Sequence, residues 1–259
     1  MCGNDTIFGE VDRVDIRGPN PIFNSSFIAI EASGEGYRRE TCNDLLSGTF
    51  KVNRSTFFNL GAGIITSMRA APPVDIRFND FSFVDFAVVF KDSNQDTTVV
   101  NNEFTLSSYL STESHGVLVE TTVQNPPAAS SVRVSRNQFI ALEFALAVRS
   151  YQLTGPANIV FLIVFNTFDY SATNADGFAA LTGGINSGVV NGNSFLGTNG
   201  TAVFIENGDV SPGISDWSIT GNSSPDNLFF VLDTQVSDSI IGPNQTSNVV
   251  NRGFNNSIL

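Results

Sequence analysis

Short runs of alternating apolar and polar residues recur along the chain, and several of them end in an Asn-x-Phe triplet. In residues 74–76 and 132–134 this alternation places the apolar side chains on one face of a strand. Most triplets are followed, after a bend, by a second apolar run. Self-similarity with a period of a few tens of residues is typical of a solenoid, in which each repeat forms one coil. The triplets occupy residues 79–81, 102–104, 137–139, 166–168 and 193–195.

Each repeat is interpreted as a strand, an asparagine turn, a short strand, a bend and another strand. We expect the Asn of each triplet to adopt a left-handed backbone conformation, which Asn tolerates better than most residues. The Asn side chains should hydrogen-bond one another along the solenoid axis, and each Phe should point inward and stack on its counterparts. Weaker copies at Asn20, Ser55, Asn222 and Asn244 bring the expected total to roughly nine coils.

This pattern resembles the repeat of the right-handed parallel β-helix proteins, the pectate-lyase-like superfamily, over about residues 18–244. The resemblance implies an all-β fold, a single-stranded right-handed parallel β-helix of roughly nine coils with an N-terminal cap. We expect one domain over residues 1–259, in which 1–17 and 32–48 form the cap or an insertion and 245–259 form the C-terminal end. Such folds host lyases, hydrolases and inert stalks alike, so the resemblance implies no single activity.

The composition excludes some classes of partner. The formal net charge is −12 and only 15% of residues are charged, which argues against nucleic acid and against anionic membranes. No apolar run is long enough for a transmembrane segment. The richness in Asn, Ser, Thr and Gly with little Lys is typical of exported proteins, so we expect an extracellular, periplasmic or cell-surface location.

Two features near the N-terminus leave alternatives open. Cys2 and Cys42 either form a disulfide that ties the cap or remain two free thiols, and Cys2 also resembles the lipidated residue of a bacterial lipoprotein. Residues 37–46 are either a helix or a loop that covers the open edge of the solenoid.

The resemblance implies a substrate groove over the strand that follows each bend. The residue just after each such strand should face outward. Most of these residues are charged, although only 15% of the residues in the whole chain are. They are either a ladder of exposed ion pairs, each contributing at most about 1 kcal/mol, or a row that binds a ligand. The row consists of Glu31, Ser67, Lys91, Glu120, Arg149, Glu206 and Asp233.

Three residues are candidates for catalysis. Lys91 and Arg149 match, by residue type and strand position, the Lys and Arg of the alginate and chondroitin lyases built on this fold. The match departs from the family pattern because Glu120 lies on the coil between them and no His-Gly follows Arg149. His115 is the only histidine and so the only neutral-pH proton shuttle, although a single exposed His is more often incidental.

Other residues are candidates for binding. Tyr109 and Tyr151 could stack on sugar rings, whereas Trp217 aligns with an inward position and is expected in the core. Asp92, Asp96 and Glu120 are oxygen ligands that could hold calcium, and scattered solvated carboxylates are the commoner alternative.

The sequence therefore favours an exported β-helix that binds a polysaccharide or cell-surface glycan, or that serves as a surface scaffold, without catalysis. One alternative is a polysaccharide lyase or epimerase acting on an acidic glycan. Another is a structural or fibre subunit, which would form homo-oligomers.

Overall fold

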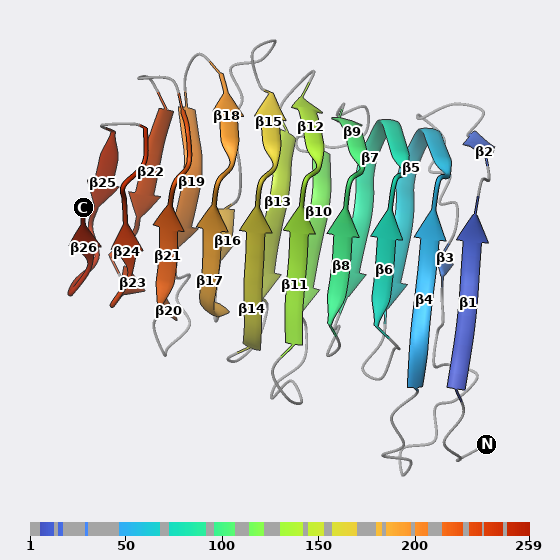
Figure 1. Ribbon diagram of the computed structural model, residues 1–259, viewed down its shortest axis with the longest axis horizontal. Coiled ribbons are helices and arrows are strands. Elements are labelled where there is room, and N and C mark those ends of the chain that lie inside the picture. The colour runs from blue at the N-terminus through green and yellow to red at the C-terminus, as the bar shows by residue number, and fades with distance from the viewer. Residues whose placement is uncertain are drawn as a thin grey trace.

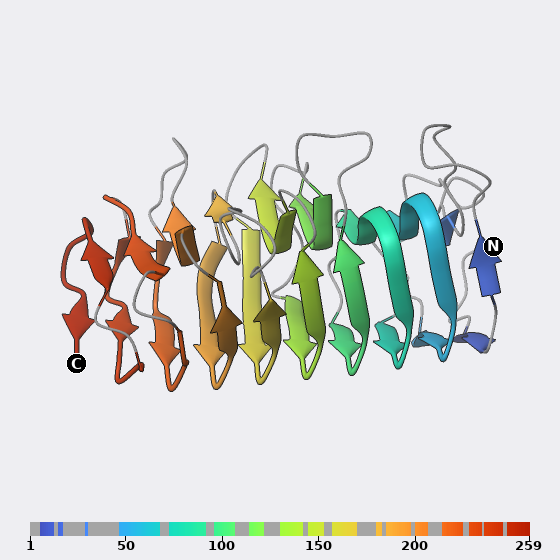
Figure 2. The same cartoon turned by 90° about the horizontal axis from the view of Figure 1, so that it is seen from above.

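The chain forms an all-β parallel β-solenoid in a computed structural model. Its strands stack side by side along one long axis, with the two ends of the chain at opposite ends of the stack (Figure 1, Figure 2). The structure describes residues 6–12, 15–17, 29–30, 47–67, 73–91, 96–106, 114–121, 130–141, 145–152, 157–169, 180–182, 185–197, 200–206, 214–224, 228–234, 236–245 and 248–259.

The first face of the solenoid is a ten-stranded sheet in which every pair of neighbours is parallel. Its strands, in stacking order, are β1 (Thr6–Asp12), β4 (Ser47–Asn53), β6 (Val74–Arg77), β8 (Thr97–Val100), β11 (Ser130–Ser135), β14 (Ala157–Val164), β17 (Ile185–Asn191), β21 (Trp217–Thr220), β24 (Ile240–Ile241) and β26 (Ser257–Ile258).

The second face consists of short strands that follow the asparagine turns, and the third face consists of the strands that follow the bends. The long strands β5 (Thr56–Ser67) and β7 (Asp80–Lys91) run through both faces and join them into one fourteen-stranded sheet. The short strands are β9 (Glu103–Leu106), β12 (Gln138–Ala141), β15 (Thr167–Asp169) and β18 (Ser194–Leu196). The strands after the bends are β10 (Ser114–Thr121), β13 (Ala145–Gln152), β16 (Ala180–Thr182), β19 (Gly200–Glu206), β22 (Leu228–Leu232) and β25 (Val249–Asn251).

The remaining strands are short. β2 (Asp15–Arg17) and β3 (Ala29–Ile30) pair with the two parts of β5, and β20 (Ile214–Ser215) pairs with β23 (Val236–Ser237).

The predicted count of roughly nine coils needs correction. Among the described residues, four coils, from β8 to β19, contain three separate strands. On the N-terminal side the bend residues stay within the strand, so the second and third strands fuse into β5 and β7. On the C-terminal side the short strand shrinks to single bridges at Ser223 and Gln245. The predicted repeat is therefore regular only in the middle of the chain.

Strands occur at both ends of the described chain. Strands β1 and β2 lie in the segment 1–17, for which a cap is predicted, and pair with β4 and β5. Strands β25 and β26 likewise extend the stack into the predicted C-terminal end, 245–259. The predicted helix at 37–46, the repeat copy at Asn20, and Cys2 and Cys42 lie outside the described residues.

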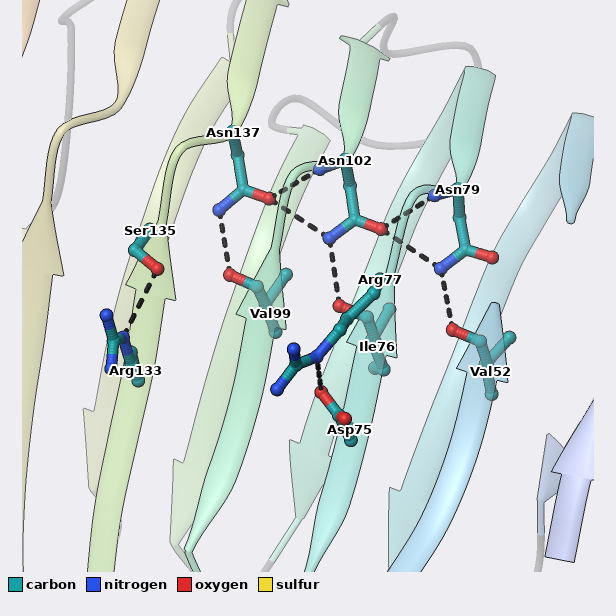
Figure 3. Close-up of polar contacts among 10 residues, drawn as sticks. All are labelled: Val52, Asp75, Ile76, Arg77, Asn79, Val99, Asn102, Arg133, Ser135 and Asn137. Atoms are coloured by element: carbon teal, nitrogen blue, oxygen red, sulfur yellow. Dashed lines mark hydrogen bonds and ion pairs between the residues drawn. The ribbon is translucent and has the colours of Figure 1, made fainter. Parts of the chain in front are cut away.

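A ladder of buried asparagines holds consecutive coils together, as predicted. In its centre, Asn137 Oδ1 accepts hydrogen bonds from the backbone N and the Nδ2 of Asn102, at 2.9 and 3.0 Å. The Nδ2 of Asn137 donates to Val99 O at 2.9 Å (Figure 3). It also donates to Asn166 Oδ1 on the following coil, at 3.1 Å. The same pattern begins at the backbone N of Ser55 and continues through Asn79, Asn102, Asn137, Asn166, Asn193, Asn222 and Asn244.

The left-handed residue is not the ladder asparagine, contrary to the prediction. It is the residue immediately before it, as at Phe78 with φ 56° and Arg136 with φ 55°. The residue with positive φ forms the turn between two strands. After this turn the backbone N and the side chain of the Asn both point along the axis toward the neighbouring coils. The residues in this position are Arg54, Phe78, Asn101, Arg136, Phe165, Gly192 and Gly221.

The phenylalanines of the triplets stack inside the solenoid, as predicted. Ring centroids of Phe81 and Phe104 lie 4.9 Å apart and the planes differ by 5°, and those of Phe104 and Phe139 lie 4.6 Å apart. These distances match the strand spacing of about 4.8 Å, because each ring is carried by the same position of successive coils. Trp217 is also buried in the core, as predicted.

Replacing Asn137 with Ala should lower the free energy of unfolding by about 3–5 kcal/mol, because two buried donors and a carbonyl on the preceding coil, and an amide oxygen on the following coil, lose a partner. Urea denaturation followed by circular dichroism measures the change. Gln138→Ala, at the exposed next residue, is the control and should change the free energy by under about 0.5 kcal/mol. Equal effects of the two substitutions would show that the ladder does not stabilise the coils.

Candidate functional site

The predicted charged row is only partly aligned in the structure. Ser67 pairs with Lys91 and Lys91 pairs with Glu120, as the row requires. On the next coil, however, Glu120 pairs with Tyr151, whereas Arg149 pairs with Leu118. The predicted row of Lys91, Glu120 and Arg149 is therefore corrected, because Arg149 lies two positions earlier on its strand.

The misalignment arises in the bend before β13. Phe81 and Phe139 both pair with Phe104 of the intervening coil, so they occupy equivalent positions. Phe86 and Leu146 are equivalent in the same way, because both pair with His115. The segment between these two positions is thus two residues longer in the coil that contains β13 than in the coil that contains β7. A shift of two residues keeps the alternation of inward and outward side chains, so the hydrophobic pattern could not reveal it.

Further members of the row lie toward the C-terminus. Glu206 pairs with Thr182 of β16, a strand that the sequence interpretation did not include. Asp233 follows β22, and its carboxylate lies 4.0 Å from a guanidinium nitrogen of Arg252. Glu31, Asp92 and Tyr109 lie outside the described residues.

His115, the candidate proton shuttle, is buried rather than exposed. Its side chain is 5% accessible, and its ring stacks on Phe86 with centroids 5.2 Å apart and planes 7° apart. The register places His115 between Phe86 and Leu146 on the neighbouring coils. The ring therefore packs between neighbouring coils, and a role for it in proton transfer stays a prediction.

The candidate calcium ligands do not form a described site. The Asp96 carboxylate accepts hydrogen bonds from the backbone N and the hydroxyl of Ser131, at 2.9 and 2.7 Å. No group of three or more metal-ligating side chains occurs within the part of the chain that the structure describes.

A different surface is hollowed. An open groove of about 700 Å³ follows the asparagine turns along the axis, across five neighbouring coils. One side is formed by the left-handed residues from Arg54 to Phe165, and the other by the residues that begin the short strands. We call this surface the turn groove. It is lined by Arg54, Ser55, Thr56, Phe78, Asn79, Asp80, Asn101, Asn102, Glu103, Arg136, Asn137, Gln138, Phe165 and Thr167.

Two large apolar side chains are exposed in the turn groove. Phe78 is 54% accessible and Phe165 is 58% accessible, whereas nine phenylalanines in the described part of the chain are buried. The Phe165 ring lies against the next coil, where a Cβ on Gly192 would come within 2.6 Å of it. The Phe165 ring therefore lies along the groove, and both rings present apolar area to solvent.

Polar and charged side chains surround the two rings. The row that begins the short strands is Thr56, Asp80, Glu103, Gln138 and Thr167 in consecutive register. The hydroxyl of Ser82 donates to Asp80 at 2.6 Å, which holds that carboxylate in place. Arg54 and Arg136 are exposed on the opposite side of the groove. The turn groove thus combines aromatic faces, carboxylates, amides and guanidinium groups.

The backbone of the turn groove is already hydrogen-bonded. Phe78 N donates to Val100 O at 3.3 Å, Asp80 N to Ser55 O at 3.0 Å, and Glu103 N to Asn79 O at 2.9 Å. Recognition of a ligand in this groove therefore falls to the side chains.

Comparisons with known proteins identify no relative. No family model matches the chain, and neither the curated proteins nor the solved structures yield a match. The parallel β-solenoid is thus established by the structure alone, and membership of the pectate-lyase-like superfamily stays a prediction. The described residues include no helix long and apolar enough to span a membrane.

The sequence interpretation missed the turn groove. Phe78 and Phe165 are in phase with the inward-facing residues of the preceding strand, 74 and 76 or 161 and 163. The alternation alone therefore predicts that both rings point inward. Only the left-handed backbone conformation at these positions turns them outward.

Replacing Phe78 with Asn should leave the free energy of unfolding unchanged or raise it by up to about 1 kcal/mol, because Asn adopts the left-handed conformation with less strain than Phe. Thermal and urea denaturation measure the effect. The contrasting variant Phe104→Ala removes a ring from the buried stack and should lose about 3–5 kcal/mol. A large loss for Phe78→Asn would mean that the exposed ring is structural.

Proposed function

We propose that the protein binds an extended glycan in the turn groove and does not cleave it. The observation that carries this proposal is the presence of two exposed phenylalanines, Phe78 and Phe165, at left-handed backbone positions.

Phenylalanine is unfavourable at these positions for two reasons. A non-glycine residue in the left-handed region costs roughly 1–2 kcal/mol, and the penalty applies fully to a bulky residue that has no polar side chain. The ring also remains more than half exposed to water. Asn101, Gly192 and Gly221 occupy the same position of other coils and support the same ladder. The fold therefore does not require Phe there, which favours a role in contacting a ligand.

The chemistry of the groove suits a sugar chain. Aromatic faces pack on the apolar C–H face of a sugar ring, while carboxylate, amide and guanidinium groups exchange hydrogen bonds with its hydroxyl groups. A groove that continues across consecutive coils fits an extended polymer better than a compact ligand. The backbone hydrogen bonds described above leave no strand edge for a peptide, and Asp80 and Glu103 disfavour a nucleic acid. An exported location is consistent with such a partner.

The double variant Phe78→Asn/Phe165→Asn should lose glycan binding while keeping its melting temperature. Affinity electrophoresis against a panel of soluble neutral and acidic polysaccharides, followed by calorimetry on those retained, measures binding. Each aromatic contact is expected to contribute about 1 kcal/mol, so the double variant should bind about 30-fold more weakly or worse.

The matched control is Phe254→Asn, which removes an equally exposed phenylalanine, 58% accessible, from outside the groove. It should leave binding unchanged. If the wild-type protein retains no polysaccharide, or if the control variant loses binding as strongly as the double variant, the proposal is wrong. Detection of a stable homo-oligomer whose interface includes Phe78 and Phe165 would instead support the fibre or scaffold alternative.

The lyase alternative is weakened by the observed register and by the burial of His115. Lys91 and Arg149 lie two positions out of line, with one intervening coil between their strands. We expect no rise in ultraviolet absorbance from unsaturated products when the protein is incubated with alginate, pectate or chondroitin. A rise that Lys91→Ala or Arg149→Ala abolishes would show that the protein is an enzyme after all.

A further inference from the structure

We propose that Gly192 is a positioning residue of the turn groove. It leaves the space in which the ring of Phe165 lies, and it thereby makes Phe165 the fixed aromatic anchor that packs on the apolar C–H face of one sugar ring. This inference rests on the proposed function and identifies the part of the groove that contributes most to its affinity.

Gly192 and Phe165 occupy the same left-handed position on consecutive coils. The backbone N of Phe165 donates to Asn191 O at 3.0 Å, which places the coil of Gly192 directly beside that of Phe165. A Cβ on Gly192 would lie 2.6 Å from both Cδ1 and Cε1 of Phe165, so that either the ring or the new side chain would have to move. The ring of Phe165 therefore extends over the following coil and occupies the place of a side chain at 192.

The left-handed conformation alone does not require glycine at 192. Asn101 has φ 55° at the same position of another coil and supports the same ladder. Gly221, one coil further along, has φ 64°, close to the 65° of Gly192. A Cβ on Gly221 would have the amide nitrogen of Asn191 as its nearest contact, at 3.2 Å, and would meet no aromatic ring. The space over Gly192 is therefore tied to the ring of Phe165.

The other exposed ring, Phe78, has no such space beside it. The backbone N of Phe78 donates to Val100 O, so the left-handed residue on the following coil is Asn101, whose Cβ stands where Gly192 leaves a gap. Phe78 is thus prevented from extending over that coil as Phe165 does. A ring that is already held in place loses less conformational entropy when a ligand binds. Phe165 should therefore contribute more to binding than Phe78.

The test measures binding of single and double variants by calorimetry on hydroxyethylcellulose, xylan, galactomannan and alginate. Gly192→Asn introduces the residue found at 101, and Asn tolerates the left-handed conformation. This variant should displace the ring of Phe165 and weaken binding about fivefold, as Phe165→Asn does. In the Phe165→Asn background, Gly192→Asn should cause no further loss, because its effect passes through the ring.

The matched control is Gly221→Asn, which makes the same substitution at the same backbone conformation, one coil away from the ring. It should leave binding unchanged, and the two glycine variants should have similar melting temperatures. The reverse change, Asn101→Gly, gives Phe78 the space that Phe165 has. It should tighten binding about threefold, because a second ring becomes fixed before the ligand binds.

The outcomes separate this inference from the proposed function. The inference is wrong if Gly192→Asn binds as tightly as the wild type, if it weakens binding further in the Phe165→Asn background, or if Gly221→Asn weakens binding equally. An Asn101→Gly variant that binds no more tightly than the wild type would also contradict it. In all these cases a loss of binding by Phe165→Asn leaves the proposed function standing. If none of the four polysaccharides binds, or if Phe78→Asn/Phe165→Asn binds as the wild type does, both fail.

Discussion

The buried asparagine ladder is the interaction on which the other features depend. The side chain of each ladder asparagine accepts hydrogen bonds from the backbone N and the amide of the preceding ladder asparagine. It donates to a backbone carbonyl of that preceding coil and to the amide oxygen of the following ladder asparagine. The ladder therefore joins each coil to both of its neighbours. A buried amide without a hydrogen-bond partner lowers the stability of the fold. The ladder therefore fixes the position of every coil along the axis relative to its neighbours. The phenylalanine stack then follows, because rings two residues beyond the ladder are brought to the same spacing.

The ladder constrains the asparagine and leaves the residue before it free. That residue needs a positive φ, and its side chain points away from the core, so its identity varies from Arg to Phe to Gly. The residues that hold the coils together and the residues that line the turn groove are thereby adjacent in the sequence. Asn79 holds the coil, whereas Phe78 and its counterparts form one side of the groove.

The repeat architecture could be predicted from the sequence, because Asn79, Phe81 and their counterparts are identical in type and alternate regularly with apolar residues. The axial alignment of the third face could not, since the two extra residues before β13 preserve the inward and outward alternation and so left Arg149 misplaced. The turn groove was missed for another reason. Its residues share a backbone conformation but no residue type, and only three-dimensional stacking brings Arg54, Phe78 and Arg136 into one line.

Because the ladder can be extended at either end, the number of coils can change during evolution. Every coil in the regular region offers the same donors to one neighbour and the same acceptors to the other, so a whole coil is a unit that can be gained or lost without creating a mismatched junction. Each coil gained would lengthen the solenoid by about 4.8 Å and add one more asparagine and one more phenylalanine to the two internal stacks, so the number of coils sets the length of the molecule.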